Sequence, residues 1–476
     1  MKKSFFASAL ALLLLAPVSV EARQWTLQDC IQYALQNNIT LQKSRVQHLS
    51  ALEDVKQSQA ALLPTLSAST SQNVSYNPWP ETGSYMIAGD KVQTNVDKVY
   101  YNGTYSIMSN WTVWNGNRNR NQVKLNKVTA TQAALDSATT ANSIQEQITQ
   151  LFVQILYCKD AIEVSKATLE TSRKNEERGQ EFVKVGSMSK ADLAQLTAQR
   201  AQDEYAVVQA ESNLRDFKRQ LKQLLQITDQ EEFDVTADVP TDEAALQAIP
   251  GVTNVYEAAL GIRPEIKNAQ LGIESSDLQI KIAKAQKLPT IGVNAGVSTN
   301  TTSMNSNNWG TQLKNNFTLG GGLSVSIPLF DNRSTKTAVN KARLAKQTYE
   351  LDLKDKQTTL YSTIENYWLQ AVNNQAQFKS AQVSTQSAQE SYELLSEQFQ
   401  QNLKNTIELM NGKDALLKAQ LSELQAKYLA ILNIHMLKFY QNGTLKTDNS
   451  VVNSLSEFSR KTKKEGHKGY FCPLCF

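Results

Sequence analysis

Apolar and polar residues alternate with a period of two in four segments of the chain. In residues 290–298, for example, Ile291, Val293 and Val297 lie on one face, and small or polar residues lie on the other. This alternation predicts β-strands with one apolar face. Each segment has about nine to eleven residues, the length of a tilted strand that crosses a bilayer. The four segments are residues 65–76, 105–113, 290–298 and 317–327.

Most of the remaining chain has a helical pattern. Residues 117–171 contain neither glycine nor proline and are rich in residues that favour helices. Apolar residues recur at spacings of three and four, which predicts long helices with narrow apolar stripes and a coiled-coil-like packing. The stripes are Ile144, Ile148, Leu151 and Ile155; Leu214, Phe217, Leu221 and Leu224; and Leu417, Leu421, Leu424, Tyr428 and Ile431.

The two halves of the chain are copies of one unit. Residues 34–64 align without a gap with residues 259–289, and both segments begin Ala-Leu and end Leu-Pro. Further on, residues 111–127 align with residues 326–344, and the segment from Phe182 aligns with the segment from Phe399. A repeat of this kind predicts that each half forms the same structure, which here is a strand pair and a long helical hairpin.

Pro64 and Pro289 are the predicted switches from helix to strand. Each follows an alanine-rich helical run and precedes an alternating segment, and proline cannot continue the hydrogen-bond ladder of a helix. The predicted division is a signal peptide (1–22), a first helix with an equatorial segment (23–63), a strand pair (64–114), a helical hairpin (115–228), an equatorial linker (229–257), a second helix (258–288), a strand pair (289–330), a second hairpin (331–445) and a disordered tail (446–476).

Residues 1–22 have the pattern of a secretory signal peptide, with two lysines, an apolar run and a small-residue cleavage site ending at Ala22. No later run approaches the roughly 18 apolar residues that a transmembrane helix needs. We therefore expect any entry into a membrane to occur by strands. The net charge of +4 includes the basic segment 460–468, and the nearly neutral remainder gives no indication of a nucleic-acid partner.

Catalytic and cofactor motifs are absent from the sequence. It contains no GxSxG, no HExxH and no phosphate-binding glycine loop, so we expect neither an enzyme nor a cofactor. His467, Cys472 and Cys475 are three potential zinc ligands. A single CxxC without a second pair is a weak metal signal, and we expect no metal site.

The number of predicted strands requires an oligomer if the strands lie in a membrane. Four strands cannot close a barrel, because the smallest membrane barrels have about eight, and open sheet edges are not tolerated in lipid. Three chains would supply twelve strands. Two alternatives remain at this stage. A soluble hairpin explains the alternation alone equally well, and a trimeric coiled-coil stalk protein with a β membrane anchor explains the helices.

Taken together, these features resemble the TolC family of outer-membrane efflux proteins. The resemblance rests on residues 25–42 (WTLQDCIQYALQNNITLQ), the paired Leu-Pro switches and the duplicated hairpins, and it extends to about Gly443. It implies a mainly α fold with membrane β-strands, in which a homotrimer forms a 12-stranded outer-membrane barrel and a periplasmic α-barrel. It also implies a passive exit duct whose partners are outer-membrane lipid, a periplasmic adaptor protein and an inner-membrane pump of the RND or ABC type.

The resemblance further implies a functional site at the periplasmic tip, where both hairpins would turn, near residues 174–190 and 391–408. The first copy keeps the family's Val-Gly motif, whereas the second copy replaces the family's Val-Gly-Thr-Arg. We expect adaptor contacts at both turns. The candidate residues are Val185, Gly186 and Ser187 in the first copy and Asn402, Leu403, Lys404 and Asn405 in the second.

Two acidic residues are candidates for an entrance gate at this tip. Asp192 matches a family aspartate in the network that holds the entrance closed. The aspartates expected in the second copy fall at Leu409 and Gly412, and Glu408 is the nearest acid. An ion pair between Asp192 and Lys404 is a candidate link between the hairpins. The alternative is that Asp192 is a solvated residue or a first-turn acid of the returning helix.

Overall fold

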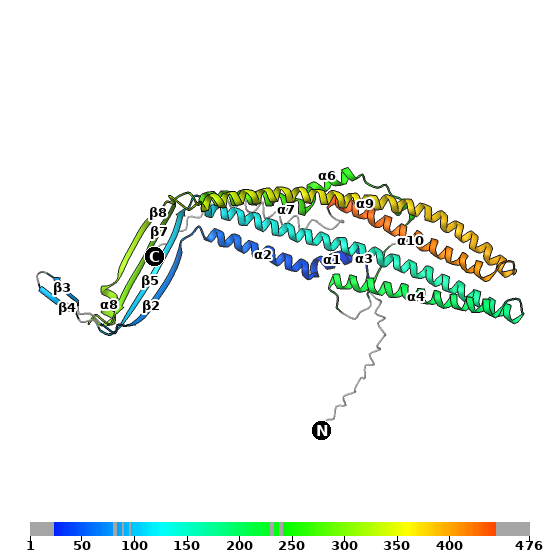
Figure 1. Cartoon of the computed structure of the whole chain (residues 1–476), viewed down its shortest axis with the longest axis horizontal. Coiled ribbons are helices and arrows are strands. Elements are labelled where there is room, and N and C mark those ends of the chain that lie inside the picture. The colour runs from blue at the N-terminus through cyan, green and yellow to red at the C-terminus, as the bar shows by residue number, and fades with distance from the viewer. Residues whose placement is uncertain are drawn as a thin grey trace, which may run out of the picture. The chain divides into compact units, whose positions relative to one another are not determined.

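The computed structural model describes residues 23–79, 83–87, 90–94, 97–228, 233–237 and 241–443. These residues are mainly helical and include one four-stranded antiparallel sheet (Figure 1), which confirms the predicted fold class. The chain divides into two compact units. The strand unit comprises the described parts of residues 43–140 and 260–360, and the hairpin unit comprises those of residues 1–42, 141–259 and 361–476.

The sheet of the strand unit joins the two copies of the duplicated sequence. Its order is β2 (Thr65–Tyr76), β5 (Val99–Trp114), β7 (Thr290–Thr302) and β8 (Thr318–Ser326). All three pairings are antiparallel, and β5 of the first copy pairs with β7 of the second. None of the four strands contains a charged residue. The outer edges of β2 and β8 have no strand partner among the described residues.

The connections within the strand pairs differ between the copies. The first copy inserts the hairpin of β3 (Gly83–Ile87) and β4 (Asp90–Thr94), whereas the second copy inserts the short helix α8 (Trp309–Asn315). The prediction for β5 was too short, because this strand begins at Val99 and not at Tyr105. Tyr100 falls on the polar side of the pattern and Tyr101 on the apolar side. They pair with Ser75 and Val74 of β2.

Helices enter and leave the sheet at short junctions. The helix α2 (Ile39–Ala60) ends in a turn, and Pro64 directly precedes β2. In the second copy α7 (Pro264–Ala285) ends shortly before Pro289, which precedes β7. Gly116, between β5 and α3 (Arg118–Lys184), has φ +65°, and a Cβ there would lie 2.7 Å from the Leu288 side chain. Glycine is required at this position by both conformation and space.

Two long helical hairpins form the body of the hairpin unit. The first consists of α3 and α4 (Lys190–Leu225), and the second of α9 (Ser334–Gln400) and α10 (Thr406–Asn442). A helix of 67 residues such as α3 or α9 rises about 100 Å. Each half of the chain therefore returns on itself, and the single continuous repeat expected for a stalk protein is not observed (Figure 1).

Small elements pack beside the hairpins within the same unit. Strand β1 (Arg23–Trp25) leads into α1 (Leu27–Asn37) and pairs in parallel with β6 (Phe233–Val235), and the remaining helices are α5 (Asp242–Ala245) and α6 (Val252–Ile262). Asp234 of β6 forms ion pairs with Lys159 of α3 at 2.8 Å and Lys218 of α4 at 2.9 Å. These contacts attach β6 to the first hairpin.

The predicted apolar stripes form the core only in part. Ile144, Ile148 and Ile155 are buried, but Phe152 takes the place that the pattern gave to Leu151. On α10 the predicted leucines and Ile431 are half-buried, whereas Tyr428 of the predicted stripe is buried. The other buried positions of this helix include small and large side chains, among them Ala419, Leu409 and Leu437. The core face of α10 therefore lies mostly beside the predicted line of leucines.

No helix in the described part of the chain is long and apolar enough to cross a membrane.

The sheet offers a matched pair of glycines for a test of strand packing. Gly296 of β7 lies opposite Gly320 of β8, but a Cβ at Gly296 would lie 2.6 Å from the Ile107 carbonyl oxygen, whereas a Cβ at Gly320 meets no atom within 4 Å. We expect Gly296→Ala to destabilise the sheet by about 1–3 kcal/mol through overpacking, and Gly320→Ala to have little effect. Semi-native gels measure the temperature at which half of the folded band of each variant is lost. Equal midpoint temperatures for the two variants would contradict the close packing at Gly296.

Candidate functional site

The α3–α4 turn is built around a left-handed glycine. Gly186 has φ +78°, a conformation that glycine adopts without steric strain. The Ser187 amide donates to the Phe182 carbonyl at 2.9 Å and so closes the end of α3. Val185, beside the glycine, is 76% exposed. The predicted contact residues of the first copy thus lie together in one exposed turn.

The α9–α10 turn has the same geometry, and asparagine replaces glycine. Asn402 has φ +57°, and asparagine is among the few other residues that tolerate this region. The Leu403 amide donates to the Gln398 carbonyl at 2.9 Å, as Ser187 does to Phe182. The turns are therefore related by a spacing of 216 residues. The alignment of Phe182 with Phe399 is wrong by one residue at the tip.

Both gate candidates occupy the same capping position. Ser189 is the N-cap of α4, and its hydroxyl accepts from the Asp192 amide at 3.0 Å and donates to the Asp192 carboxylate at 2.7 Å. Asn405 is the N-cap of α10, and the Glu408 amide donates to its side chain at 2.8 Å. A carboxylate here interacts favourably with the helix dipole. The alternative of a first-turn acid describes Asp192 correctly.

The corrected spacing changes the expectation for the second copy. The first acidic position expected there falls on Glu408 itself, and the second falls on Asn411. The residues named by the earlier alignment have packing roles: Leu409 is buried, and Gly412 lies against Leu395.

Lys404 does not link the hairpins in the single chain. Lys404 lies in the α9–α10 turn, and its ammonium group pairs at 2.7 Å with Glu408 in the first turn of α10, within the same hairpin. Among the described residues no ion pair joins Asp192 to Lys404, so that candidate link is wrong for this conformation. The hydrogen bond from Lys404, together with that from the Asn405 amide, holds the pKa of the Glu408 carboxyl below its usual range.

An apolar cluster joins the two hairpins beneath the turns. It contains Leu196 of α4, Tyr392 and Phe399 of α9, and Leu409 of α10. Phe182 of α3 packs against it, with its ring centroid 5.9 Å from that of Phe399. Burial raises the pKa of Tyr392, whose hydroxyl accepts a hydrogen bond from Asn175 of α3 at 3.3 Å. The two turns are therefore held side by side by a shared core.

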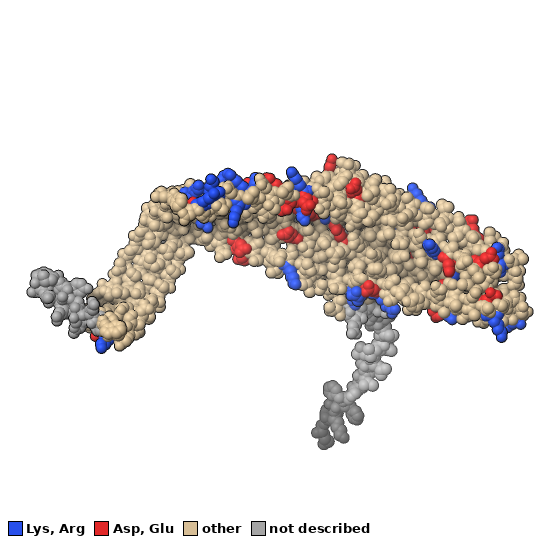
Figure 2. Space-filling view, in the orientation of Figure 1, with Lys and Arg blue, Asp and Glu red and all other residues tan. Residues whose placement is uncertain are grey.

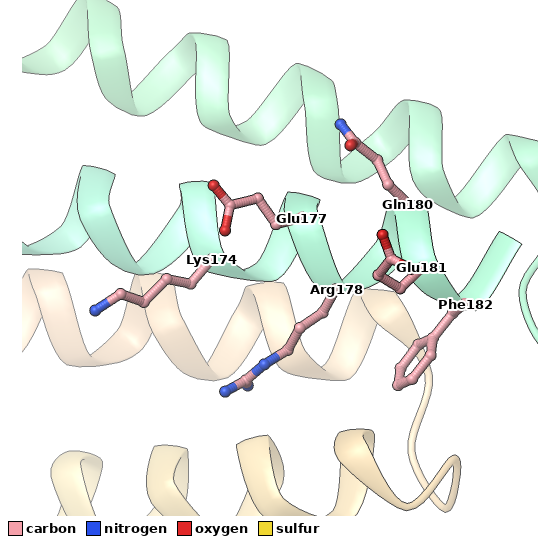
Figure 3. A pocket seen from close by; sticks show the side chains of 6 residues that line it. All are labelled: Lys174, Glu177, Arg178, Gln180, Glu181 and Phe182. Carbon is pink, nitrogen blue, oxygen red and sulfur yellow. The ribbon is translucent and has the colours of Figure 1, made fainter. Parts of the chain in front are cut away.

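A shallow depression on α3 borders this cluster. In Figure 3 the side chains of Arg178 and Phe182 extend from α3 towards the second hairpin. Its lining comes from a single helix, which makes it part of the charged helix surface and gives no arrangement of a catalytic or ligand-binding kind. The lining residues are Lys174, Glu177, Arg178, Gln180, Glu181 and Phe182.

A buried polar network lies next to the apolar cluster, and the sequence interpretation missed it. Lys413 of α10 forms an ion pair with Asp203 of α4, and their side chains are only 4% and 7% exposed. Ser172 of α3 donates to Asp203 at 2.5 Å and accepts from Lys413 at 3.0 Å. Gln199 donates to Asp203 at 3.1 Å. The network connects the second hairpin to both helices of the first.

The position of this network could have been recognised from spacing. On α4 the buried residues Leu196, Gln199, Asp203 and Val207 follow one another at three, four and four residues. A polar or charged residue in an apolar stripe is a signal for a buried pair, because a charge is rarely buried without a partner. The stripe was interpreted only where it was apolar.

The part of the chain that the structure describes contains no group of three or more His, Cys, Asp or Glu residues able to hold a metal ion. His467, Cys472 and Cys475, like the predicted signal peptide and tail, lie outside the described residues.

The fold and the duplicated tip define a class of protein, the outer-membrane channel-tunnels. The chain matches the profile of the outer membrane efflux protein family over residues 30–226 and 255–438, and it belongs to that family. The protein is therefore an outer-membrane exit duct of the efflux or secretion type, located in the Gram-negative outer membrane and extending into the periplasm.

Relatives of known name cover nearly the whole chain. The alkaline protease secretion protein AprF of Pseudomonas aeruginosa is 23% identical over 428 residues, which are 87% of this chain and 84% of that protein. The toxin and drug export protein A of Aggregatibacter actinomycetemcomitans is 21% identical and covers 85% of this chain and 83% of its own length. The crystal structure of the Campylobacter jejuni CmeC outer membrane channel superposes with a TM-score of 0.72 at 17% identity, covering 91% and 89% of the two chains.

The buried ion pair permits a direct test of the contact between hairpins. We expect Lys413→Met to destabilise the hairpin unit by about 3–5 kcal/mol, because it leaves the buried Asp203 carboxylate without its partner. The double variant Lys413→Met/Asp203→Leu should recover most of the loss. Thermal unfolding followed by circular dichroism gives the comparison. Lys418→Met, an exposed site on the same helix, is the control, and an equal loss in this control would contradict a specific role for the pair.

Proposed function

We propose that three copies of the chain form a continuous channel, with a 12-stranded barrel in the outer membrane. The open edges of β2 and β8 support this proposal, because unpaired strand edges are not tolerated in lipid. Pairing β8 of one copy with β2 of the next would leave no edge. The absence of charge from all four strands fits a wall in contact with lipid on one face.

The helix surfaces of the single chain also favour assembly. Several large apolar side chains on α9 and α4 are exposed, and exposed apolar surface of this extent is typical of interaction sites. In a trimer the helices of neighbouring copies would cover them. These residues are Leu344, Leu351, Leu369, Val372 and Val383 of α9, and Tyr205 and Val208 of α4.

The tip formed by the two turns is the proposed entrance and the proposed adaptor contact. Val185 is 76% exposed in the first turn, and Leu403 is 68% exposed in the second, so each turn presents an apolar side chain that a partner could bury. Asp192 and Glu408 begin the two returning helices at the same level. We assign them to the mouth of the duct. Separation of the hairpins during opening would have to break the Lys413–Asp203 network.

The exit duct would function with a periplasmic adaptor protein and an inner-membrane pump of the RND or ABC type. The relatives support both kinds of system, since one is named for protease secretion and another for toxin and drug export. The pump would select the substrate, and this chain would provide the passage.

The open edges of β2 and β8 are the main observation behind the channel proposal. Measurements on the purified, assembled protein test it. We expect the protein purified from outer membranes to have the mass of a trimer in detergent and to form discrete pores in planar bilayers. Asp203→Leu/Lys413→Met, which removes the polar link between the hairpins, should raise the open fraction of these pores. A monomer without conductance would rule out the channel.

The adaptor contact has a separate test. We expect Val185→Asp combined with Leu403→Asp to reduce export at least tenfold in cells, because a charge at each turn would have to be desolvated in the adaptor interface. Trimer mass and pore conductance should remain unchanged. Export by a control carrying Ser212→Asp, an exposed polar site farther along α4, should stay at the wild-type level. Normal export by the turn variant would remove the turns from the adaptor interface.

A further inference from the structure

Three of the four helix–strand junctions in the strand unit are strongly basic. Lys and Arg side chains gather over the ends of α7 and α9 next to the uncharged strands (Figure 2). The first turns of α3 are also rich in Lys and Arg. All of these cations are exposed: Arg118, Arg120, Lys124 and Lys127 of α3; Lys281, Lys284 and Lys287 at the end of α7; and Arg333, Lys336, Lys341 and Arg343 at the start of α9.

Acidic partners for these cations are scarce. Residues 115–127 and 281–289 contain no Asp or Glu, and residues 329–346 contain only Asp331. The Asp331 carboxylate accepts from the Thr335 amide at 2.9 Å and so serves the start of α9. None of the cations named above forms an ion pair with a described residue, whereas nearby Lys346 pairs with Asp277 at 2.8 Å. Apart from Lys287, which interacts electrostatically with Asp331, these exposed charges have no acidic partner given by the structure among the described residues.

Helix stability does not explain this placement. Cations at a helix N-terminus interact unfavourably with the helix dipole, yet α3 and α9 both begin with them and have no acid in the first turn. At the other end of the hairpins the helices start as the dipole favours, with Asp192 in α4 and Glu408 in α10. The basic ends are those that adjoin the strands.

Exposed apolar side chains lie between the strands and the cations. Leu329 and Phe330, which connect β8 to α9, are 94% and 86% exposed. Trp111 near the end of β5 is also exposed. The order along the chain is therefore an uncharged strand, an apolar or aromatic segment, and then a run of cations. Interfaces of membrane proteins show this order where the hydrocarbon gives way to charged headgroups.

We infer that the cations named above form a basic collar that binds the anionic headgroups of phospholipids in the periplasmic leaflet of the outer membrane. The inference rests on the outer-membrane location of the protein and does not require the trimer. Lys and Arg near an anionic membrane surface are attracted to it within about a Debye length, roughly 8–10 Å at moderate salt. The exposed Leu329 and Phe330 favour lipid over the soluble anionic polymers of the cell wall, because a polymer would leave them in water.

The collar is tested on the full-length protein by native mass spectrometry in detergent, titrated with phosphatidylglycerol or phosphatidylcholine. We expect the wild type to prefer phosphatidylglycerol, and the preference to weaken as salt rises. Neutralisation of three collar residues in Lys336→Gln/Lys341→Gln/Arg343→Gln should reduce the affinity for phosphatidylglycerol by roughly tenfold or more, since each cation contributes about fivefold.

The matched control removes three exposed cations from the hairpin unit, in Arg173→Gln/Lys190→Gln/Arg215→Gln, and should retain the wild-type affinity. Equal affinity for the two lipids, or equal loss in both triple variants, would overturn the collar. A third outcome would replace lipid by a wall polymer. In that case the wild type would sediment with purified cell-wall sacculi, the collar variant would not, and neither protein would prefer one lipid. The salt dependence is measured on the wild type, so it does not depend on whether a variant folds. Pore conductance is measured on each preparation, because a preparation that conducts but shows no lipid preference contradicts the collar and not the channel.

Discussion

The need to satisfy backbone hydrogen bonds at strand edges is the constraint on which this structure depends. Each chain builds a sheet of four strands, and the two copies of the duplication meet at the β5–β7 pairing in its centre. Duplication therefore doubles the sheet but leaves β2 and β8 as open edges. In the proposed outer-membrane barrel such edges cannot remain unpaired, so the proposed wall closes only when several chains pair their edges. The long helices that continue from the strands then have to pack in the same symmetry.

The two ends of the long helices are electrostatically different, and this difference follows their surroundings. At the tip, Asp192 and Glu408 occupy equivalent capping positions, where a carboxylate both accepts backbone hydrogen bonds and opposes the helix dipole. At the membrane end, α3 and α9 begin with cations that the dipole disfavours. Local helix stability accounts for the first pattern. The anionic membrane surface inferred above would account for the second.

Periodicity predicted the long helices and the four strands because each buries or presents one regular face, and Pro64 and Pro289 stand where helix gives way to strand. The exact positions of the second turn and of the buried helix faces were harder to predict from the sequence. Asn402 adopts the left-handed conformation of Gly186, so a search for a Val-Gly motif shifts the second turn by one residue. Phe152 is buried where the pattern predicted Leu151, and the predicted leucines of α10 are only half-buried, because helix contact depends on partners far away in sequence. Asp203 was missed for a different reason: it continues the buried face of α4 as a charged residue, and only apolar residues were taken as evidence of burial.

The Lys413–Asp203 pair has a consequence that apolar packing alone would not provide. The contacts of α10 with its neighbours include small residues such as Ala419 and Ala426, and a narrow seam of small side chains has similar packing after a shift of one helical turn. A shift of that size would separate Lys413 from both Asp203 and Ser172 and leave it with Asp414 of its own helix. Breaking a buried ion pair costs about 3–5 kcal/mol. The pair thus sets the register between the hairpins. In the proposed opening by separation of the hairpins, the same contact would have to break, so one buried contact would link the alignment of the hairpins to the opening of the duct.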